Sequence, residues 1–240
     1  MRILIPAVIF AAALAVASPA AAQATGSSSS TQKTPSKPPK PKKPPVPRKP
    51  IGLRAFFIVD SEFMSASKSF SASTGSSTMF GFGGGGEILN VWKSIFARVA
   101  FSTASKSGDR GFVADGEFIS TGFPVDFGVD TIELGAGWRT YMKKHPKVAL
   151  YAGGGVLFVN YSQTSPDPAT AQENFSERFT GFSAQGGLEY ALSKWLTAAV
   201  EGQYRGVPNA LGEAGISKAY GETDLGGFAI RGMVGIRFKK

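Results

Sequence analysis

Apolar and polar residues alternate with a period of two along much of the chain after residue 50. In residues 196–205, "LTAAVEGQYR", every second position from Leu196 to Tyr204 is apolar or glycine, while Glu201, Gln203 and Arg205 lie on the opposite face. The same alternation occurs in "FAIRGMVGIRF", "TIELGAGWRTY", "IFARVAFS" and "FSAQGGLEY". A period of two predicts β-strands whose two faces meet different surroundings.

The connections between these segments predict how the strands are joined. Two further segments, around 52–63 and 147–161, are apolar on both faces, and the stretch that ends at Leu89 supplies another strand. Short connections at 90–93, 143–147 and 192–194 alternate with long polar ones at roughly 64–77, 105–127, 162–177 and 206–222. We therefore predict an all-β, eight-stranded antiparallel up-and-down barrel, with a tight end that holds both barrel termini and a loop-rich end.

A glycine-rich stretch, "GFGGGGEIL" at 81–89, matches the spacing G-x-G-x-x-G through Gly81, Gly83 and Gly86. A dinucleotide-binding turn needs a helix directly after this motif, so that the pyrophosphate lies at the helix N-terminus. Here "EILNVWKSIF" leads instead through a short turn into another strand. Because glycine also clusters in other predicted strands, we interpret it as a means of bending a small barrel and leaving room inside.

The charged face of the predicted strands carries six basic and six acidic residues. They are Arg54, Asp60, Glu62, Glu87, Arg98, Glu133, Arg139, Glu189, Glu201, Arg205, Arg231 and Arg237. A soluble barrel would turn this face to water, whereas a membrane barrel turns it inward and its apolar face to lipid. The predicted strands are long enough to cross a bilayer, which needs about 9–11 tilted residues. We predict a transmembrane barrel whose interior charges pair with one another and leave no continuous pore.

Aromatic residues near the ends of the segments support the same polarity, because aromatic girdles lie at the two membrane–water interfaces. We assign Trp92, Trp138, Tyr141, Tyr151, Tyr190, Trp195 and Phe238 to the tight end. We assign Phe63, Phe80, Phe101, Phe127, Tyr161, Phe179 and Tyr204 to the loop end.

The first 50 residues differ in composition from the rest. Residues 1–22 resemble a secretory signal, with Arg2, an apolar core and an A-x-A site before Gln23. Residues 23–50 are rich in proline and lysine and lack acids and aromatics, which predicts a disordered periplasmic segment. Eight of the 26 basic residues lie in these 50 positions, so 18 remain against all 17 acids and the predicted barrel (51–240) is nearly neutral. We therefore expect no nucleic-acid partner. For residues 33–50, a solvated tether and a contact with peptidoglycan or another periplasmic polyanion both remain open.

Few residues suggest catalysis or metal binding. The chain has no cysteine, and its single histidine, His145, lies in the short turn "KKHPK". Asp60 and Glu62 have an acid–base spacing, but interior arginines are simpler partners for them. Loop acids could meet divalent ions or lipopolysaccharide, yet they follow no calcium-loop spacing: Asp109, Asp115, Asp126, Glu173 and Glu177. We expect no cofactor and no metal.

These features together resemble the small outer-membrane β-barrel family of Gram-negative bacteria, the OmpA/OmpX-like group, over residues 51–240. The resemblance is carried by the signal, strands such as "LTAAVEGQYR", the alternation of turns and loops, and the closing "GGFAIRGMVGIRF". The family's last strand usually ends on an aromatic residue, and Phe238 has that place here, although Lys239 and Lys240 follow it. No catalytic motif of the family is present.

The resemblance implies a monomeric, non-enzymatic protein of the outer membrane, surrounded by lipid and lipopolysaccharide. We expect a role in envelope integrity or in surface contact through the long loops, which would face outward. Three alternatives remain: a small-solute channel, a barrel enzyme that modifies lipid A, and a soluble periplasmic barrel.

Overall fold

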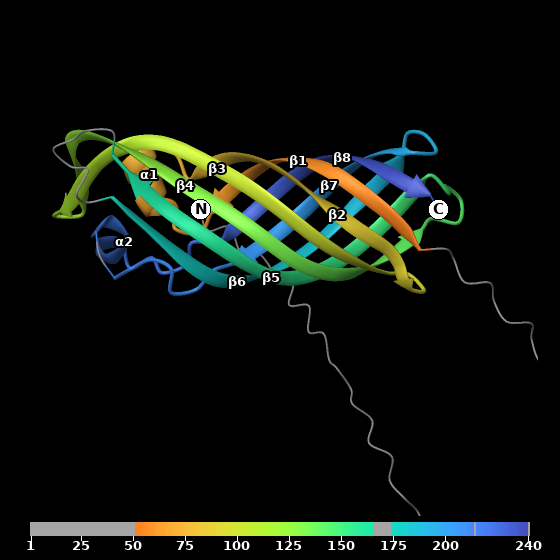
Figure 1. Ribbon diagram of the computed structural model, residues 1–240. Helices are drawn as coiled ribbons and strands as arrows, with labels where there is room; N and C mark the ends of the chain where they lie inside the picture. Colours follow the sequence, from red (N-terminus) through yellow and green to blue (C-terminus); the bar gives the residue numbers. More distant parts are fainter. Residues whose placement is uncertain (1–50, 166–173, 214, 240) are drawn as a thin grey trace, which may run out of the picture. The chain divides into compact units, whose positions relative to one another are not determined.

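Eight strands form a closed, fully antiparallel barrel in chain order, and β1 pairs with β8 to complete it (Figure 1). The computed structural model describes residues 51–165, 174–213 and 215–239; the predicted signal (1–22) and the Pro/Lys-rich segment (23–50) lie outside them. The strands are β1 Gly52–Met64, β2 Thr78–Trp92, β3 Ile95–Ala114, β4 Glu117–Tyr141, β5 Val148–Thr164, β6 Phe175–Ala191, β7 Leu196–Gly206 and β8 Gly227–Lys239. Two helices, α1 Ser67–Thr74 and α2 Gly215–Tyr220, lie in the connections. The predicted fold class is confirmed.

The two ends of the barrel differ as predicted. Short turns join β2 to β3, β4 to β5 and β6 to β7 at one end, which we call the tight end. Gly52 pairs with Lys239, so the start of β1 and the end of β8 also lie at the tight end. The other end, the loop end, carries α1, α2 and the long connections (Figure 1, left). Among the described residues, neither helix is long and apolar enough to cross a membrane.

One predicted loop is wrong. Residues 105–127 do not form a loop, because β3 and β4 continue through them as a hairpin that pairs as far as Ala114 and Glu117. The turn is Asp115–Gly116, and both residues have positive φ, at 53° and 83°. An Asp-Gly turn of this kind matches the twist of a two-stranded ribbon. The hairpin therefore extends the wall of the barrel at the loop end.

The polarity of the barrel is that predicted for a membrane protein. Large apolar side chains cover its outside; Phe57 is 53% exposed and Phe101 is 61% exposed. Alternate positions on the same strands point inward, and there Arg98 and Glu201 are 2% and 0% exposed. Water would disfavour so large an apolar exterior, whereas lipid favours it.

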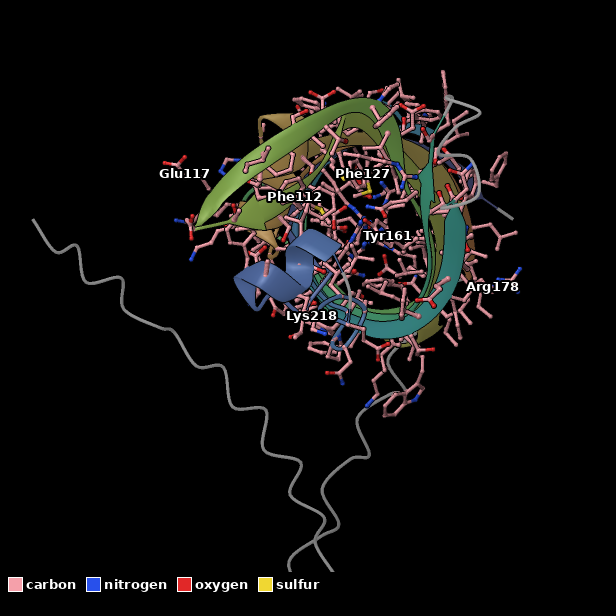
Figure 2. The ribbon with its side chains drawn as sticks, turned by 90° about the vertical axis from the view of Figure 1, so that its left-hand side faces the viewer. Phe112, Glu117, Phe127, Tyr161, Arg178 and Lys218 are labelled. Carbon is pink, nitrogen blue, oxygen red and sulfur yellow. The ribbon has the colours of Figure 1, made fainter. Side chains whose placement is uncertain are left out.

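The predicted aromatic girdles need a correction. Most of these side chains do lie exposed on the outer surface, including Trp92, Trp195 and Phe80. Tyr151, Phe127 and Tyr161, however, are buried, and Figure 2 shows Phe127 and Tyr161 pointing into the barrel. Phe179 is partly buried and packs against apolar side chains inside the barrel. Alternation decides this, because these four residues share the inward-facing parity of their strands.

The glycine-rich stretch 81–89 lies within β2, between β1 and β3, so the structural interpretation is confirmed. Inward-facing glycines make room for interior rings. A Cβ at Gly85 would lie 2.8 Å from Cζ of Phe56, and one at Gly137 would lie 2.5 Å from Cζ of Phe96. At these two positions, the narrow lumen has room for a phenylalanine ring because the neighbouring strand carries no side chain there.

Candidate functional site

The interior charges form one connected network. All twelve residues named from the sequence take part in ion pairs, and eleven of them are buried. The remaining one, Arg237, has a side chain that is 17% exposed. Every strand except β5 contributes at least one member, so the network ties most of the wall together across the lumen.

Basic residues predominate in the part of the network nearest the tight end. The Glu87 carboxylate lies 3.0 Å from Arg54, 2.8 Å from Arg98 and 3.1 Å from Arg139. Glu189 lies 2.6 Å from Arg54 and 3.2 Å from Arg139, and it also pairs with Arg237. Four guanidinium groups thus surround two carboxylates.

Acidic residues predominate in the rest of the network. Arg231 lies 3.2 Å from Glu133, 3.3 Å from Glu201 and 3.5 Å from Asp60. Arg205 lies 2.5 Å from Glu62 and 3.3 Å from Asp60. Here two guanidinium groups meet four carboxylates.

The pair Arg98–Glu201, at 2.7 Å, joins the two groups. Each group alone carries an excess of one sign of charge, and the excesses cancel across this contact. Interior aromatic rings add support, because Arg98 and Arg139 lie 5.6 Å and 5.4 Å from the ring centre of Tyr151. Cations over aromatic faces are stabilised in this geometry.

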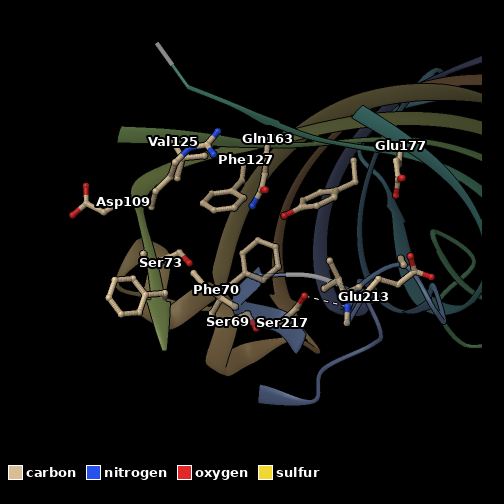
Figure 3. A pocket seen from close by; sticks show the side chains of 18 of the residues that line it. Ser69, Phe70, Ser73, Asp109, Val125, Phe127, Gln163, Glu177, Glu213 and Ser217 are labelled. Carbon is tan, nitrogen blue, oxygen red and sulfur yellow. Dashed lines mark hydrogen bonds between the residues drawn. The ribbon is translucent and has the colours of Figure 1, made fainter. Parts of the chain in front are cut away.

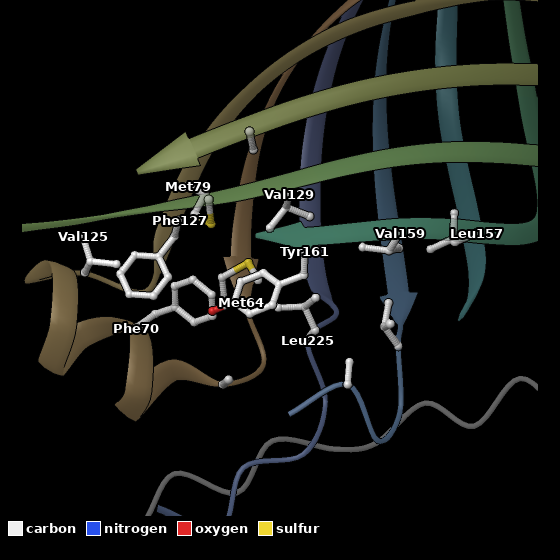
Figure 4. Close-up of a cluster of buried hydrophobic side chains, with 14 residues drawn as sticks. Met64, Phe70, Met79, Val125, Phe127, Val129, Leu157, Val159, Tyr161 and Leu225 are labelled. Carbon is white, nitrogen blue, oxygen red and sulfur yellow. The ribbon is translucent and has the colours of Figure 1, made fainter. Parts of the chain in front are cut away.

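An apolar plug closes the loop end of the lumen. It consists of buried residues from α1, strands β1 to β5 and the β1–β2 and β7–β8 connections. Figure 4 labels ten of them: Met64, Phe70, Met79, Val125, Phe127, Val129, Leu157, Val159, Tyr161 and Leu225. Phe70 of α1 packs on Phe127 of β4, with ring centres 5.8 Å apart. The inward face of the barrel therefore changes from charged to apolar towards the loops.

Hydrogen bonds hold α1 in this position. The Glu222 carboxylate accepts hydrogen bonds from the backbone N–H groups of Lys68 and Ser69, at 2.9 and 2.8 Å, and from the Ser69 hydroxyl at 2.6 Å. Gly75 ends the helix with a φ of 74°, and its N–H donates to the Ser71 carbonyl. Carboxylates stabilise helix N-termini, whose N–H groups have no partner within the helix. Glu222 therefore fastens the β1–β2 connection to the β7–β8 connection.

A cavity of about 930 Å³ opens above the plug. Its lining comes from α1, the β3–β4 hairpin, β5, β6 and residues 209–213 and 216–217. Phe70, Val125 and Phe127 form its buried floor, and Gln163 and Glu177 lie on the wall (Figure 3). Buried Tyr161 and partly buried Phe179 also line the cavity. The alternating pattern predicts neither the plug nor this cavity. The one signal for the plug in the sequence is that residues 147–161 are apolar on both faces.

The remaining residues considered for chemistry lie apart. His145 is exposed in the β4–β5 turn, where its backbone N–H donates to the Met142 carbonyl at 3.1 Å. Asp60 and Glu62 both face Arg205 inside the barrel. Asp126 accepts a hydrogen bond from Ser107, Asp109 accepts one from Ser120, and Glu173 lies outside the described residues. Within the part of the chain that the structure describes, no three His, Cys, Asp or Glu residues form a group that could hold a metal ion.

No protein-family model and no curated protein matches the chain. Several solved structures are similar in fold. The attachment invasion locus protein Ail of Yersinia pestis, solved with the heparin analogue sucrose octasulfate, is 11% identical with a TM-score of 0.46, over 78% of this chain and 98% of that one. Neisserial surface protein A is 12% identical with a TM-score of 0.47, over 79% and 97%. A major outer membrane protein of Thermus thermophilus is 13% identical with a TM-score of 0.46, over 78% and 99%. At this level of similarity we transfer no property, and the function is argued from the chain's own residues.

Proposed function

We propose that the chain is a non-enzymatic outer-membrane β-barrel with a sealed lumen, which acts in envelope integrity or in surface contact through its loop end. The observation that carries this proposal is the inverted polarity: an apolar exterior around an ion-paired interior. Such a barrel presents its apolar surface to lipid and keeps its charges away from it. The partners implied are membrane lipid and lipopolysaccharide, and the protein acts as a monomer.

The sealed lumen argues against the alternative of a small-solute channel. A permeating solute would have to pass both the charge network and the apolar plug. Breaking one buried ion pair costs roughly 3–5 kcal/mol, and the side chains of the plug are apolar apart from the Tyr161 hydroxyl. Two barriers of different chemistry in series favour a structural or surface role over transport.

The position of His145 argues against the alternative that the chain is an enzyme that modifies lipid A. The side chain lies in a turn at the tight end, whereas the cavity lies at the loop end. We expect His145→Ala to leave the mass profile of lipid A unchanged. A changed profile in cells that carry this variant would favour the enzyme instead.

The proposal also covers the role of residues 33–50, which belong to the Pro/Lys-rich segment. We propose that they act as a periplasmic tether, and binding to peptidoglycan or another polyanion is the sharper alternative. Co-sedimentation with purified peptidoglycan separates the two: the full chain and a variant with Lys33, Lys37, Lys40, Lys42 and Lys43 changed to Gln should sediment equally if the segment is only a tether.

Single-cysteine labelling tests location and orientation together, because the native chain has no cysteine. Glu117→Cys lies at the tip of the β3–β4 hairpin, and Lys144→Cys lies in a tight-end turn. A membrane-impermeant maleimide should label Glu117→Cys on intact cells and Lys144→Cys only after the outer membrane is permeabilised. Release of the protein by alkali without detergent would show instead that it is a soluble periplasmic barrel.

A further inference from the structure

The cavity at the loop end has the size and lining of a small-molecule site. Ligand sites have volumes of roughly 300–1,000 Å³ and combine aromatic walls with a few polar groups. The cavity here has about 930 Å³, and six aromatic side chains line it: Phe70, Phe112, Phe123, Phe127, Tyr161 and Phe179. They come from α1, the β3–β4 hairpin, β5 and β6, so closure of the barrel brings them together.

The charges that a bound molecule would meet are mainly negative. Of the charged residues on the lining, Asp109 points away from the aromatic side chains (Figure 3), and Arg178 points out of the barrel (Figure 2). Arg110 has its Nε and one Nη atom buried. Glu177 and Glu213, in contrast, are exposed side chains on the lining. Two exposed carboxylates thus lie on the lining of a space that also has aromatic walls.

Aromatic faces and carboxylates favour the same kind of ligand. The face of an aromatic ring is electronegative and attracts ammonium groups. A carboxylate forms strong, charge-assisted hydrogen bonds with the same groups. The apolar floor of Phe70, Val125 and Phe127 in turn favours an apolar body over a fully hydrated ion.

We propose that the loop-end cavity binds a small amphipathic organic cation, with its aromatic or alicyclic body on the plug and its protonated amine at Glu177 and Glu213. This inference deepens the proposed function. It rests on that function only in one respect, which is the side of the membrane that the cavity faces. Binding by the purified barrel tests the cavity alone, and the cysteine labelling described above tests its orientation.

Dansylcadaverine is a suitable probe, since it joins a fluorescent aromatic ring to a primary amine. Its binding to the full chain in lipid nanodiscs is followed by fluorescence, with empty nanodiscs as the background. Dansylglycine, which carries a carboxylate on the same ring, is the matched probe of opposite charge. We expect saturable binding of dansylcadaverine and at least about tenfold weaker binding of dansylglycine, because only the amine can form charge-assisted hydrogen bonds with the two carboxylates.

Two variants place the site. Gln163→Trp fills the cavity from the inward face of β5 and should abolish saturable binding. Thr164→Trp adds the same ring on the outward face of the next position and should bind like the unchanged protein. Glu177→Gln keeps the shape of the wall and should weaken dansylcadaverine binding about tenfold while leaving dansylglycine unaffected or improved.

The proposal is overturned if dansylcadaverine and dansylglycine bind equally, or if Gln163→Trp binds as well as Thr164→Trp. Gln163→Trp could lose binding because it fails to fold, so Glu177→Gln provides a second test. If Glu177→Gln binds dansylcadaverine as tightly as the unchanged chain does, the proposed site is also excluded. Labelling of Glu117→Cys only in permeabilised cells would remove the proposed function and leave the binding result intact.

Discussion

The lumen is closed by two regions that differ in physical character. Towards the tight end, six arginines and six carboxylates hold one another in a network that spans the barrel. Towards the loop end, methionine, valine, leucine and aromatic side chains pack without charges. The first region depends on complete pairing, whereas the second depends on filled volume.

This difference has consequences for how each region tolerates change. A buried charge that loses its partner keeps its full desolvation cost, so the network is sensitive to single substitutions even of the same shape. The plug instead tolerates substitutions that conserve volume and responds to those that leave a hole. Stability measurements on matched variants therefore separate the two regions.

The largest effect should follow Glu87→Gln. This isosteric change removes the charge between Arg54, Arg98 and Arg139, and it should lower the free energy of unfolding by roughly 3–5 kcal/mol. Urea unfolding in lipid vesicles measures it. Glu117→Gln at the exposed hairpin tip is the control and should change stability by no more than about 0.5 kcal/mol. Equal stability of the two variants would mean that the network contributes little to the free energy of unfolding.

A second effect, of similar or smaller size, should follow Leu157→Ala in the plug. Leu157 is fully buried on the inward face of β5, and its truncation should cost roughly 2–5 kcal/mol. Leu157→Met conserves the volume and should cost less than about 1.5 kcal/mol. If alanine and methionine destabilise equally, the plug is not close-packed. In the network, by contrast, the isosteric change Glu87→Gln should still cause a large loss of stability.

The smallest effect should follow Glu222→Gln. It weakens the hydrogen bonds to the N-terminus of α1, which is worth roughly 0.5–2 kcal/mol. The loss should be local, so hydrogen exchange should accelerate in α1 and remain unchanged in β1 and β8. Acceleration throughout the barrel would show that α1 contributes to global stability rather than only covering the lumen.

The sequence predicts the network better than the plug, and the reason is physical. A charged residue at an alternate strand position, such as Glu201 or Arg231, indicates which face of the strand points inward, because a charged side chain is unfavourable in lipid. An apolar residue such as Val159 suits either lipid or a packed interior, so alternation alone leaves its direction open. For that reason the sequence pattern places Tyr151, Phe127, Tyr161 and Phe179 in the aromatic girdles, whereas the structure places them inside the barrel.

The cavity could not be predicted for a related reason. Its lining comes from connections whose path depends on contacts distant in sequence, such as that between Glu222 and Ser69. The β3–β4 hairpin did have a local signal in Asp115–Gly116, but the polar residues around it obscured the alternation on which strand prediction depends.

Conductance in planar lipid bilayers tests the sealed lumen most directly. The purified barrel should insert, as its shifted mobility on an unheated gel would show, and should pass no steady current above the bilayer background. Long, uniform openings from correctly folded protein would contradict the account, because neither the ion-paired region nor the apolar plug could then be closed.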